Sequence, residues 1–133
     1  MLDKATILRT IDEAYATRAR GKKEELAKLW APGATFRLVA TDMPSAVPTG
    51  SADPLESVNT LIDLFTFKKH ERLDAIVEGN AAAVLWAVEI ATPSGKSAKT
   101  ELYDLWKFSP DGKVISMTQF ADTALLERLV RSG

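Results

Sequence analysis

The sequence predicts an α+β fold, in which helices from the first half pack on one face of an antiparallel sheet formed mainly by the second half. Two patterns lead to this prediction. Apolar residues recur at spacings of three and four in segments of the first 65 residues, and apolar and polar residues alternate in later segments. Consecutive strands joined by short turns pair in antiparallel fashion. The 133 residues are the length of one domain with its own core.

Helices are expected at two places before the first strand. The first covers residues 5–20 and ends at Gly21, because glycine commonly ends helices. Its apolar side carries Ile7, Leu8, Ile11, Ala14 and Tyr15. The second helix, residues 22–30, is short and ends at an Ala-Pro-Gly sequence. A strand over residues 35–39 and a proline- and glycine-rich loop over residues 42–51 follow.

A third helix, from Asp53 to about residue 65, has the clearest local signal. Asp53 suits the N-cap, Pro54 suits the first helical position, and Glu56 stands three residues after the cap. Because all three preferences agree, the start of this helix is predicted at residue 53.

Four strands and a last helix complete the chain. Turn sequences at Gly79-Asn80, Pro93-Ser94-Gly95-Lys96 and Pro110-Asp111-Gly112 separate them. The strands are expected at residues 70–78, 82–91, 99–109 and 113–121, and a short helix carries Leu125, Leu126, Leu129 and Val130.

Composition argues against several classes of function. The net charge is −1 and the 17 basic residues are scattered, so no nucleic-acid partner is expected. Without cysteine, and with His70 the one histidine, a dedicated transition-metal site is not expected. The longest apolar run, residues 81–88, is too short for a membrane span, and the first residues do not resemble a signal peptide. We therefore expect a soluble cytoplasmic protein without a membrane partner. No glycine-rich phosphate loop or Ser-His-Asp set is evident, so no cofactor is expected.

Asp104 is the most informative polar residue. Side chains alternate along a strand, so Asp104 shares a face with Leu102 and Trp106. A carboxylate on an apolar face is costly unless it is paired, protonated or lining a cavity. Two interpretations stay open: a functional acid in a pocket, or a structural aspartate bound by a backbone amide or an arginine.

Three other polar residues are weaker candidates. Asp122 either caps the last helix or faces the same cavity as Asp104, because the alternation in the last strand is ambiguous. Glu89 is expected on the polar side of its strand, at solvent or a subunit interface. His70 is expected at the surface, with a catalytic role as the alternative.

Large apolar side chains are expected to form the core and to line the pocket that a curled sheet leaves above helices. Tyr15 is the best hydrogen-bond donor among the aromatic residues, because a buried phenol needs a partner. The expected lining consists of Trp30, Phe36, Leu38, Phe67, Trp86, Leu102, Trp106 and Met117.

The sequence around Asp104 resembles the SnoaL-like and ketosteroid isomerase-like families of the nuclear transport factor 2-like superfamily. The motifs that carry the resemblance are Leu29-Trp30-Ala31-Pro32-Gly33-Ala34-Thr35, Glu101-Leu102-Tyr103-Asp104-Leu105-Trp106-Lys107-Phe108, Asp111-Gly112-Lys113-Val114-Ile115 and Gln119-Phe120-Ala121-Asp122-Thr123. The resemblance extends over residues 1–133 as one domain. It implies a cone-shaped, curled antiparallel sheet with three N-terminal helices on its concave face and a short C-terminal helix.

The resemblance also implies a catalytic set. The acidic oxyanion-site position of ketosteroid isomerases falls on Asp104, whereas the position of their catalytic base falls on Leu38 and that of the helix-one tyrosine on Ala14, next to Tyr15. In SnoaL-like cyclases and related epoxide hydrolases, an aspartate near the position of Asp122 takes part in acid–base work. Candidate catalytic residues are therefore Asp104, Asp122 and Tyr15, and classical steroid isomerisation is not expected.

These observations lead to an expected function. The chain would bind a small, largely apolar organic molecule, as a cofactor-independent isomerase, cyclase or hydrolase that uses carboxylates. The alternative is a non-catalytic ligand-binding or assembly module, which the absence of the usual base favours. A homodimer through the convex face of the sheet is expected because Tyr103 and Leu105 lie on the outer face, and the family commonly dimerises in this way.

The capping signal at the third helix generates a first prediction. Substitution Asp53→Ala removes the side-chain oxygen that accepts from the first free amides of the helix, and should lower the free energy of unfolding by about 1 kcal/mol. Urea denaturation measures this change. An unchanged midpoint would show that Asp53 is not the cap.

Overall fold

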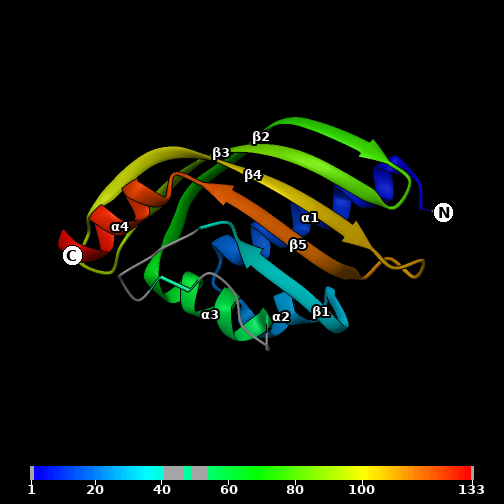
Figure 1. The fold of residues 1–133 in the computed structure, drawn as a ribbon, viewed down its shortest axis with the longest axis horizontal. Coiled ribbons are helices and arrows are strands. Elements are labelled where there is room, and N and C mark those ends of the chain that lie inside the picture. Colours follow the sequence, from blue (N-terminus) through cyan, green and yellow to red (C-terminus); the bar gives the residue numbers. More distant parts are fainter. Residues whose placement is uncertain (1, 41–46, 49–53, 133) are drawn as a thin grey trace.

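A curved sheet arches over the helices in the computed structural model, which describes residues 2–40, 47–48 and 54–132 (Figure 1). The described elements are α1 (Lys4–Ala19), α2 (Lys23–Ala27), β1 (Trp30–Leu38), α3 (Pro54–Leu64), β2 (Thr66–Glu78), β3 (Ala81–Ala91), β4 (Ser97–Phe108), β5 (Val114–Ala121) and α4 (Thr123–Ser132). This is the predicted α+β cone, in which α1 to α3 lie under the sheet and α4 ends the chain.

The sheet has the order β1-β5-β4-β3-β2. Strands β2 to β5 form the predicted antiparallel meander, whereas β1 pairs with β5 in parallel, so the sheet is mixed. The parallel pair is possible because a long stretch of chain, containing α3 and three strands, separates β1 from β5 and lets the chain return in the same direction. Its register places Phe36 beside Met117 and Leu38 beside Gln119.

The segment after α2 differs from expectation. Helix α2 ends at Ala27, and Trp30 is the first residue of β1 instead of the end of a helix. The amide of Val114 donates to the carbonyl of Leu29, and Trp30 is in register with Val114, so pairing with β5 outweighs helix continuation. A register shift between Trp30 and Thr35, with Gly33 at a φ of 76°, accommodates the Ala-Pro-Gly sequence as an irregularity in the strand.

Two further boundaries bear on the predictions. Strand β2 begins at Thr66, four residues before the expected start at residue 70, and brings Phe67 into register with Ile90. Helix α3 begins at Pro54, while the Asp53 cap and most of the expected loop at residues 42–51 lie outside the described residues. No helix in the described ranges is long and apolar enough to cross a membrane.

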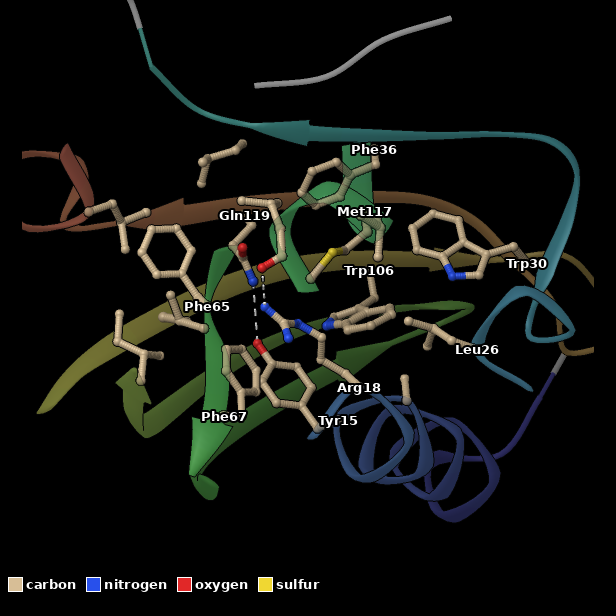
Figure 2. Close-up of a pocket in the computed structure, with 17 residues that line it drawn as sticks. Tyr15, Arg18, Leu26, Trp30, Phe36, Phe65, Phe67, Trp106, Met117 and Gln119 are labelled. Carbon is tan, nitrogen blue, oxygen red and sulfur yellow. Dashed lines mark hydrogen bonds between the residues drawn. The ribbon is translucent and has the colours of Figure 1, made fainter. Parts of the chain in front are cut away.

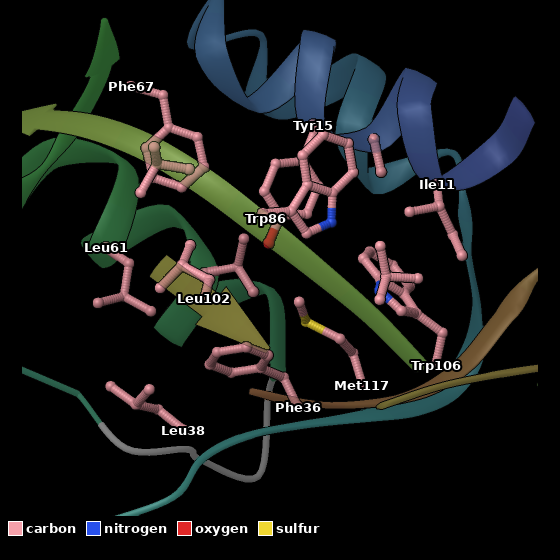
Figure 3. Close-up of a cluster of buried hydrophobic side chains, with 14 of the residues drawn as sticks. Ile11, Tyr15, Phe36, Leu38, Leu61, Phe67, Trp86, Leu102, Trp106 and Met117 are labelled. Atoms are coloured by element: carbon pink, nitrogen blue, oxygen red, sulfur yellow. The ribbon is translucent and has the colours of Figure 1, made fainter. Parts of the chain in front are cut away.

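The core lies between α1 and the concave face of the sheet (Figure 3). Helix α1 contributes Ile7, Ile11, Ala14 and Tyr15 to this face, as the apolar spacing predicts. Along β4 every second side chain from Leu102 to Phe108 is buried, so the predicted inward orientation of Asp104 is confirmed. The alternation is regular because β4 pairs on both sides with other strands of the meander.

The sequence does not show which residues of strand β5 face inward, because the strand contains an irregularity. The register with β4 shifts between Lys107 and Phe108, so that Phe108 is opposite Val114 and Trp106 is opposite Met117. Val114 and Met117 are both buried, although they lie three positions apart in the strand. A bulge of this kind lets two residues of one strand face the same side at an odd spacing. It brings Met117 and the following alternate residue, Gln119, towards the helices.

Candidate functional site

A pocket opens between α1, α3 and the concave face of the sheet (Figure 2). The cavity has a volume of about 80 Å³, counted as the positions open to the centre of a water-sized sphere. This is enough for several waters or a small organic molecule. Its polar side chains are Tyr15, Arg18 and Gln119, together with two indoles. The lining residues are Ala14, Tyr15, Arg18, Leu26, Trp30, Phe36, Leu38, Val58, Leu61, Phe65, Phe67, Ile90, Leu102, Trp106, Met117, Gln119 and Leu126.

Most of the side chains expected in the lining are there. Trp30, Phe36, Leu38, Phe67, Leu102, Trp106 and Met117 all border the pocket. Trp86 does not, which corrects that part of the expectation. Its ring stacks on Tyr15 with centroids 3.8 Å apart and an interplanar angle of 8°, so Tyr15 lies between Trp86 and the pocket.

Asp104 lies one layer behind the pocket wall, with none of its surface exposed. The Tyr15 hydroxyl donates to Asp104 Oδ2 at 2.5 Å, and the Gln119 side-chain amide donates to Oδ1 at 3.0 Å. No salt bridge to Asp104 is present within the described residues. Of the interpretations open in sequence, the arginine-locked aspartate is therefore not observed. Asp104 is connected to the pocket through Tyr15 and Gln119, which both border it.

Burial dominates the protonation of this group. Desolvation raises the pKa of Asp104 from its ordinary value of 3.8 to about 7, against the hydrogen bonds from Tyr15 and Gln119, which favour the carboxylate. The Trp106 indole opposes the rise as well, although its N–H makes no well-formed hydrogen bond. Burial, followed by the charge of Asp104, raises the pKa of Tyr15 well above 10. At neutral pH, Tyr15 keeps its proton and Asp104 can either hold or release one.

Gln119 is a site residue that sequence reasoning missed. It lies directly opposite Asp104 in the β4–β5 register, and its Nε2 is also 3.4 Å from the Tyr15 hydroxyl. The bulge in β5 obscured the signal, because simple alternation did not show which residues of this strand face inward. Within the Gln119-Phe120-Ala121-Asp122-Thr123 motif, the sequence favours the aspartate as the candidate, whereas the structure places the glutamine at the site.

Arg18 is the second residue that was missed. It lies one turn after Tyr15 on α1 and reaches into the pocket, where Nη2 donates to the carbonyl of Leu61 at 3.1 Å (Figure 2). Its Cζ lies 4.1 Å from the centroid of the Phe67 ring. Burial lowers its pKa to about 10, so it stays a cation at neutral pH. The available signal was its spacing of three and four from Tyr15 and Ala14, which places it on the buried side of the helix.

The remaining polar candidates lie away from the pocket. Asp122 is exposed, and its Oδ1 accepts from the amide of Leu125 at 3.1 Å, as an N-cap of α4 does. Asp104 and Asp122 therefore do not form a pair around one cavity. Glu89 is half-buried on the other side of β3, in register with Lys99. His70 is half-buried, with its ring centroid 6.2 Å from that of Tyr15.

No cluster of three or more metal-binding side chains occurs in the part of the chain that the structure describes. The polar groups that border the pocket include a phenol, a carboxamide and a guanidinium, with one carboxyl behind them.

Comparison with known proteins identifies the family to which this chain belongs. Residues 11–117 match the model of the SnoaL-like domain, so the chain belongs to the SnoaL-like family. No curated protein matches the sequence.

Solved structures share the fold over nearly their whole length. An NTF2-like protein of unknown function from Burkholderia pseudomallei is 18% identical, with a TM-score of 0.76 over 94% of this chain and 97% of that one. The epoxide hydrolase/cyclase-like enzyme SalBIII is 22% identical, with a TM-score of 0.74 over 93% and 96% of the two chains. A putative SnoaL-like polyketide cyclase from Jannaschia is 17% identical, with a TM-score of 0.72 over 100% and 99%. At these identities the likeness establishes the fold alone.

The pKa of Asp104 generates a prediction about stability. Between about pH 4 and pH 7 the folded protein holds a proton on Asp104 that the unfolded chain has released. The resulting contribution to the free energy of unfolding is fully present below pH 4 and is lost as the pH rises through about 7. A pKa difference of this size corresponds to a contribution on the order of 4 kcal/mol. Asp104→Asn should remove this pH dependence, as measured by urea denaturation across the range.

The matched control is Asp122→Asn, which makes the same chemical change at an exposed cap where asparagine serves as well as aspartate. Its stability should follow that of the wild type at every pH. Parallel curves for the wild type and Asp104→Asn would mean that Asp104 is ionised throughout, and would contradict the prediction.

Proposed function

We propose that this chain is a SnoaL-like enzyme that binds a small, largely apolar organic molecule and moves a proton on it without a cofactor. Isomerisation, cyclisation and hydrolysis are the reaction types that such a step serves. The observation that carries the proposal is the hydrogen bond from Tyr15 to a fully buried Asp104 at the wall of an apolar pocket. A buried carboxyl with a pKa of about 7 suits general acid–base catalysis, because it gives and takes protons near neutral pH.

Tyr15 connects this carboxyl to the pocket. The phenol of Tyr15 donates its proton to Asp104 Oδ2. When Asp104 is protonated, its proton can pass to the Tyr15 oxygen while the phenol proton passes to an oxygen of the ligand. The ligand then carries the proton, Tyr15 is again neutral, and Asp104 is again a carboxylate with its two donors. The reverse transfer removes a proton from the ligand.

Gln119 holds the carboxylate end of this relay in place. Its Nε2 donates to Asp104 Oδ1, so that the carboxylate keeps a partner after it has given up its proton. The stack of Tyr15 on Trp86 fixes the plane of the phenol. Orientation of both groups before the ligand arrives reduces the reorganisation that proton transfer requires.

Family membership supports this class of function. One structural relative is named as an epoxide hydrolase/cyclase-like enzyme, acting in pyran ring formation, and another as a putative polyketide cyclase. Proton transfer to or from an oxygen-bearing organic molecule is common to such reactions. We propose the same general chemistry here, with the relay of Tyr15 and Asp104 in place of a carboxylate that borders the ligand directly.

The second candidate is a module that binds a ligand without transforming it. The observation that favours it is the lining position of Leu38, where the resemblance places the catalytic base of ketosteroid isomerases. Asp104 also does not itself border the pocket. Binding and turnover must therefore be measured separately.

The test uses a panel of cyclic enones, β,γ-unsaturated ketones and aryl epoxides. Thermal shift identifies the members that bind, since a ligand of the folded state raises its stability. NMR in D₂O then follows proton exchange next to the carbonyl and ring opening of the epoxides. Loss of the relay in Tyr15→Phe or Asp104→Asn should lower the rate by about 10²- to 10⁴-fold while binding changes by only a few fold.

The control is again Asp122→Asn, which lies outside the pocket and should keep the wild-type rate. Ligands that bind to the wild type without exchange or ring opening would contradict the enzymatic function and support the binding module. Equal rates in the wild type and both relay variants would show that Tyr15 and Asp104 do not carry the proton.

We also propose a homodimer through the convex face of the sheet. Tyr103 and Phe120 are opposite each other in the β4–β5 register and are 41% and 50% exposed, and Leu105 nearby is 39% exposed. A continuous group of exposed large apolar side chains is typical of a partner surface. Light scattering at tens of micromolar should give twice the chain mass, and Phe120→Lys should give the mass of one chain. A monomeric wild type would rule out this dimer.

A further inference from the structure

The pocket contains a positive charge that the proton relay does not use. Arg18 borders the pocket from α1, and Figure 2 shows its guanidinium among the lining side chains near Tyr15 and Gln119. One nitrogen, Nη2, donates to the carbonyl of Leu61 on α3. The guanidinium also lies over the face of Phe67, a contact that attracts a cation weakly.

The other terminal nitrogen of Arg18 is in a different situation. Nη1 is buried and makes no hydrogen bond within the described residues. A buried donor without an acceptor is costly, and more so when it carries charge. The contact with Phe67 and the single carbonyl therefore leave part of the guanidinium unsatisfied.

No carboxylate in the described ranges neutralises this cation. The carboxylate whose charge acts on it, Asp63, is exposed and is paired with Lys23 at 2.7 Å. Asp104 is held by Tyr15 and Gln119, and the charge of Arg18 is not among the groups that shift the pKa of Asp104. The pKa of Arg18, lowered by burial to about 10, agrees with a desolvated cation that is still charged at neutral pH.

We infer that the natural ligand carries an anionic oxygen, as a carboxylate or an ionised enol, on an apolar body, and that this oxygen binds Nη1 of Arg18. The inference rests on the proposed function, since it names the class of ligand that the same pocket takes. Apolar side chains such as Phe36 and Met117 remain for the body of the ligand.

A purely structural Arg18 is the competing explanation. In that case the bond to Leu61 and the contact with Phe67 join α1 to α3 and β2, and the charge has no ligand. The two explanations differ in their effect on selectivity. A structural brace affects all ligands of the pocket alike, whereas an anion-binding guanidinium distinguishes a carboxylate from its neutral isostere.

The experiment compares cyclohexanecarboxylate with cyclohexanecarboxamide at pH 8, where the acid is fully ionised. The two probes have nearly the same shape and differ in charge. Quenching of tryptophan fluorescence reports binding, because Trp30 and Trp106 border the pocket. The wild type should bind the carboxylate about 10- to 100-fold more tightly than the amide, as hydrogen bonds to charged groups are the stronger ones.

Substitution Arg18→Met keeps the unbranched aliphatic part of the side chain but removes the guanidinium and its charge. It should abolish the preference for the carboxylate and leave binding of the amide within a few fold. The matched control is Arg20→Met, two residues later on the exposed side of the helix end, where the arginine pairs with Glu25 at the surface. This control should keep the wild-type preference.

The outcomes separate this inference from the proposed function. Equal binding of both probes to the wild type, or an unchanged preference in Arg18→Met, overturns the inference while a ligand-binding pocket stands. A preference that depends on Arg18 supports the inference even if no proton exchange is found for any ligand. If neither probe binds at millimolar concentration while neutral ketones do, the anionic ligand is ruled out. If Arg18→Met does not fold, the comparison of the two probes on the wild type decides.

Discussion

The burial of Asp104 is the constraint on which the arrangement of this protein depends. A carboxyl with no exposed surface must find its donors inside the protein, and each of the two that it finds comes from a different element: Tyr15 from α1 and Gln119 from β5. Both bonds form only if the helix crosses the sheet at one place and the strand register is correct. The same polar contacts that compensate for desolvation therefore fix the position of α1 on the sheet and form the pocket wall.

Irregular features of the sheet serve this arrangement. The bulge between β4 and β5 brings Met117 and Gln119 to the inner side, and the parallel pairing of β1 places Phe36 and Leu38 next to them. The shift at Ala-Pro-Gly allows β1 to begin at Trp30, whose side chain also borders the pocket. A regular antiparallel sheet with the same sequence would turn some of these side chains outward.

Asp104 and Arg18 are kept apart at the pocket. Asp104 faces Tyr15 and Gln119, whereas Arg18 faces Leu61 and Phe67. Had they formed a buried ion pair, the cation would have held the pKa of the carboxyl low instead of near 7. In the roles that we propose for them, their separation leaves a proton-transferring group and an anion-binding group available to the same ligand. This combination suits a molecule that is itself acidic and changes its protonation during reaction.

The sequence by itself determined the local features: the apolar side of α1, the positions of the turns, the four-strand meander, and the inward orientation of Asp104. These features follow from the spacing and type of neighbouring residues. It also identified most of the pocket lining, because large apolar side chains on inner faces have few other places to go. Only the tertiary structure decided that β1 pairs in parallel, that Gln119 and Arg18 belong to the site, and that Asp122 caps a helix outside it. Those features depend on contacts between residues far apart in the chain and on a bulge that breaks the alternation. They also depend on which hydrogen-bond donors remain unpaired after packing. None of these can be read from a local sequence pattern.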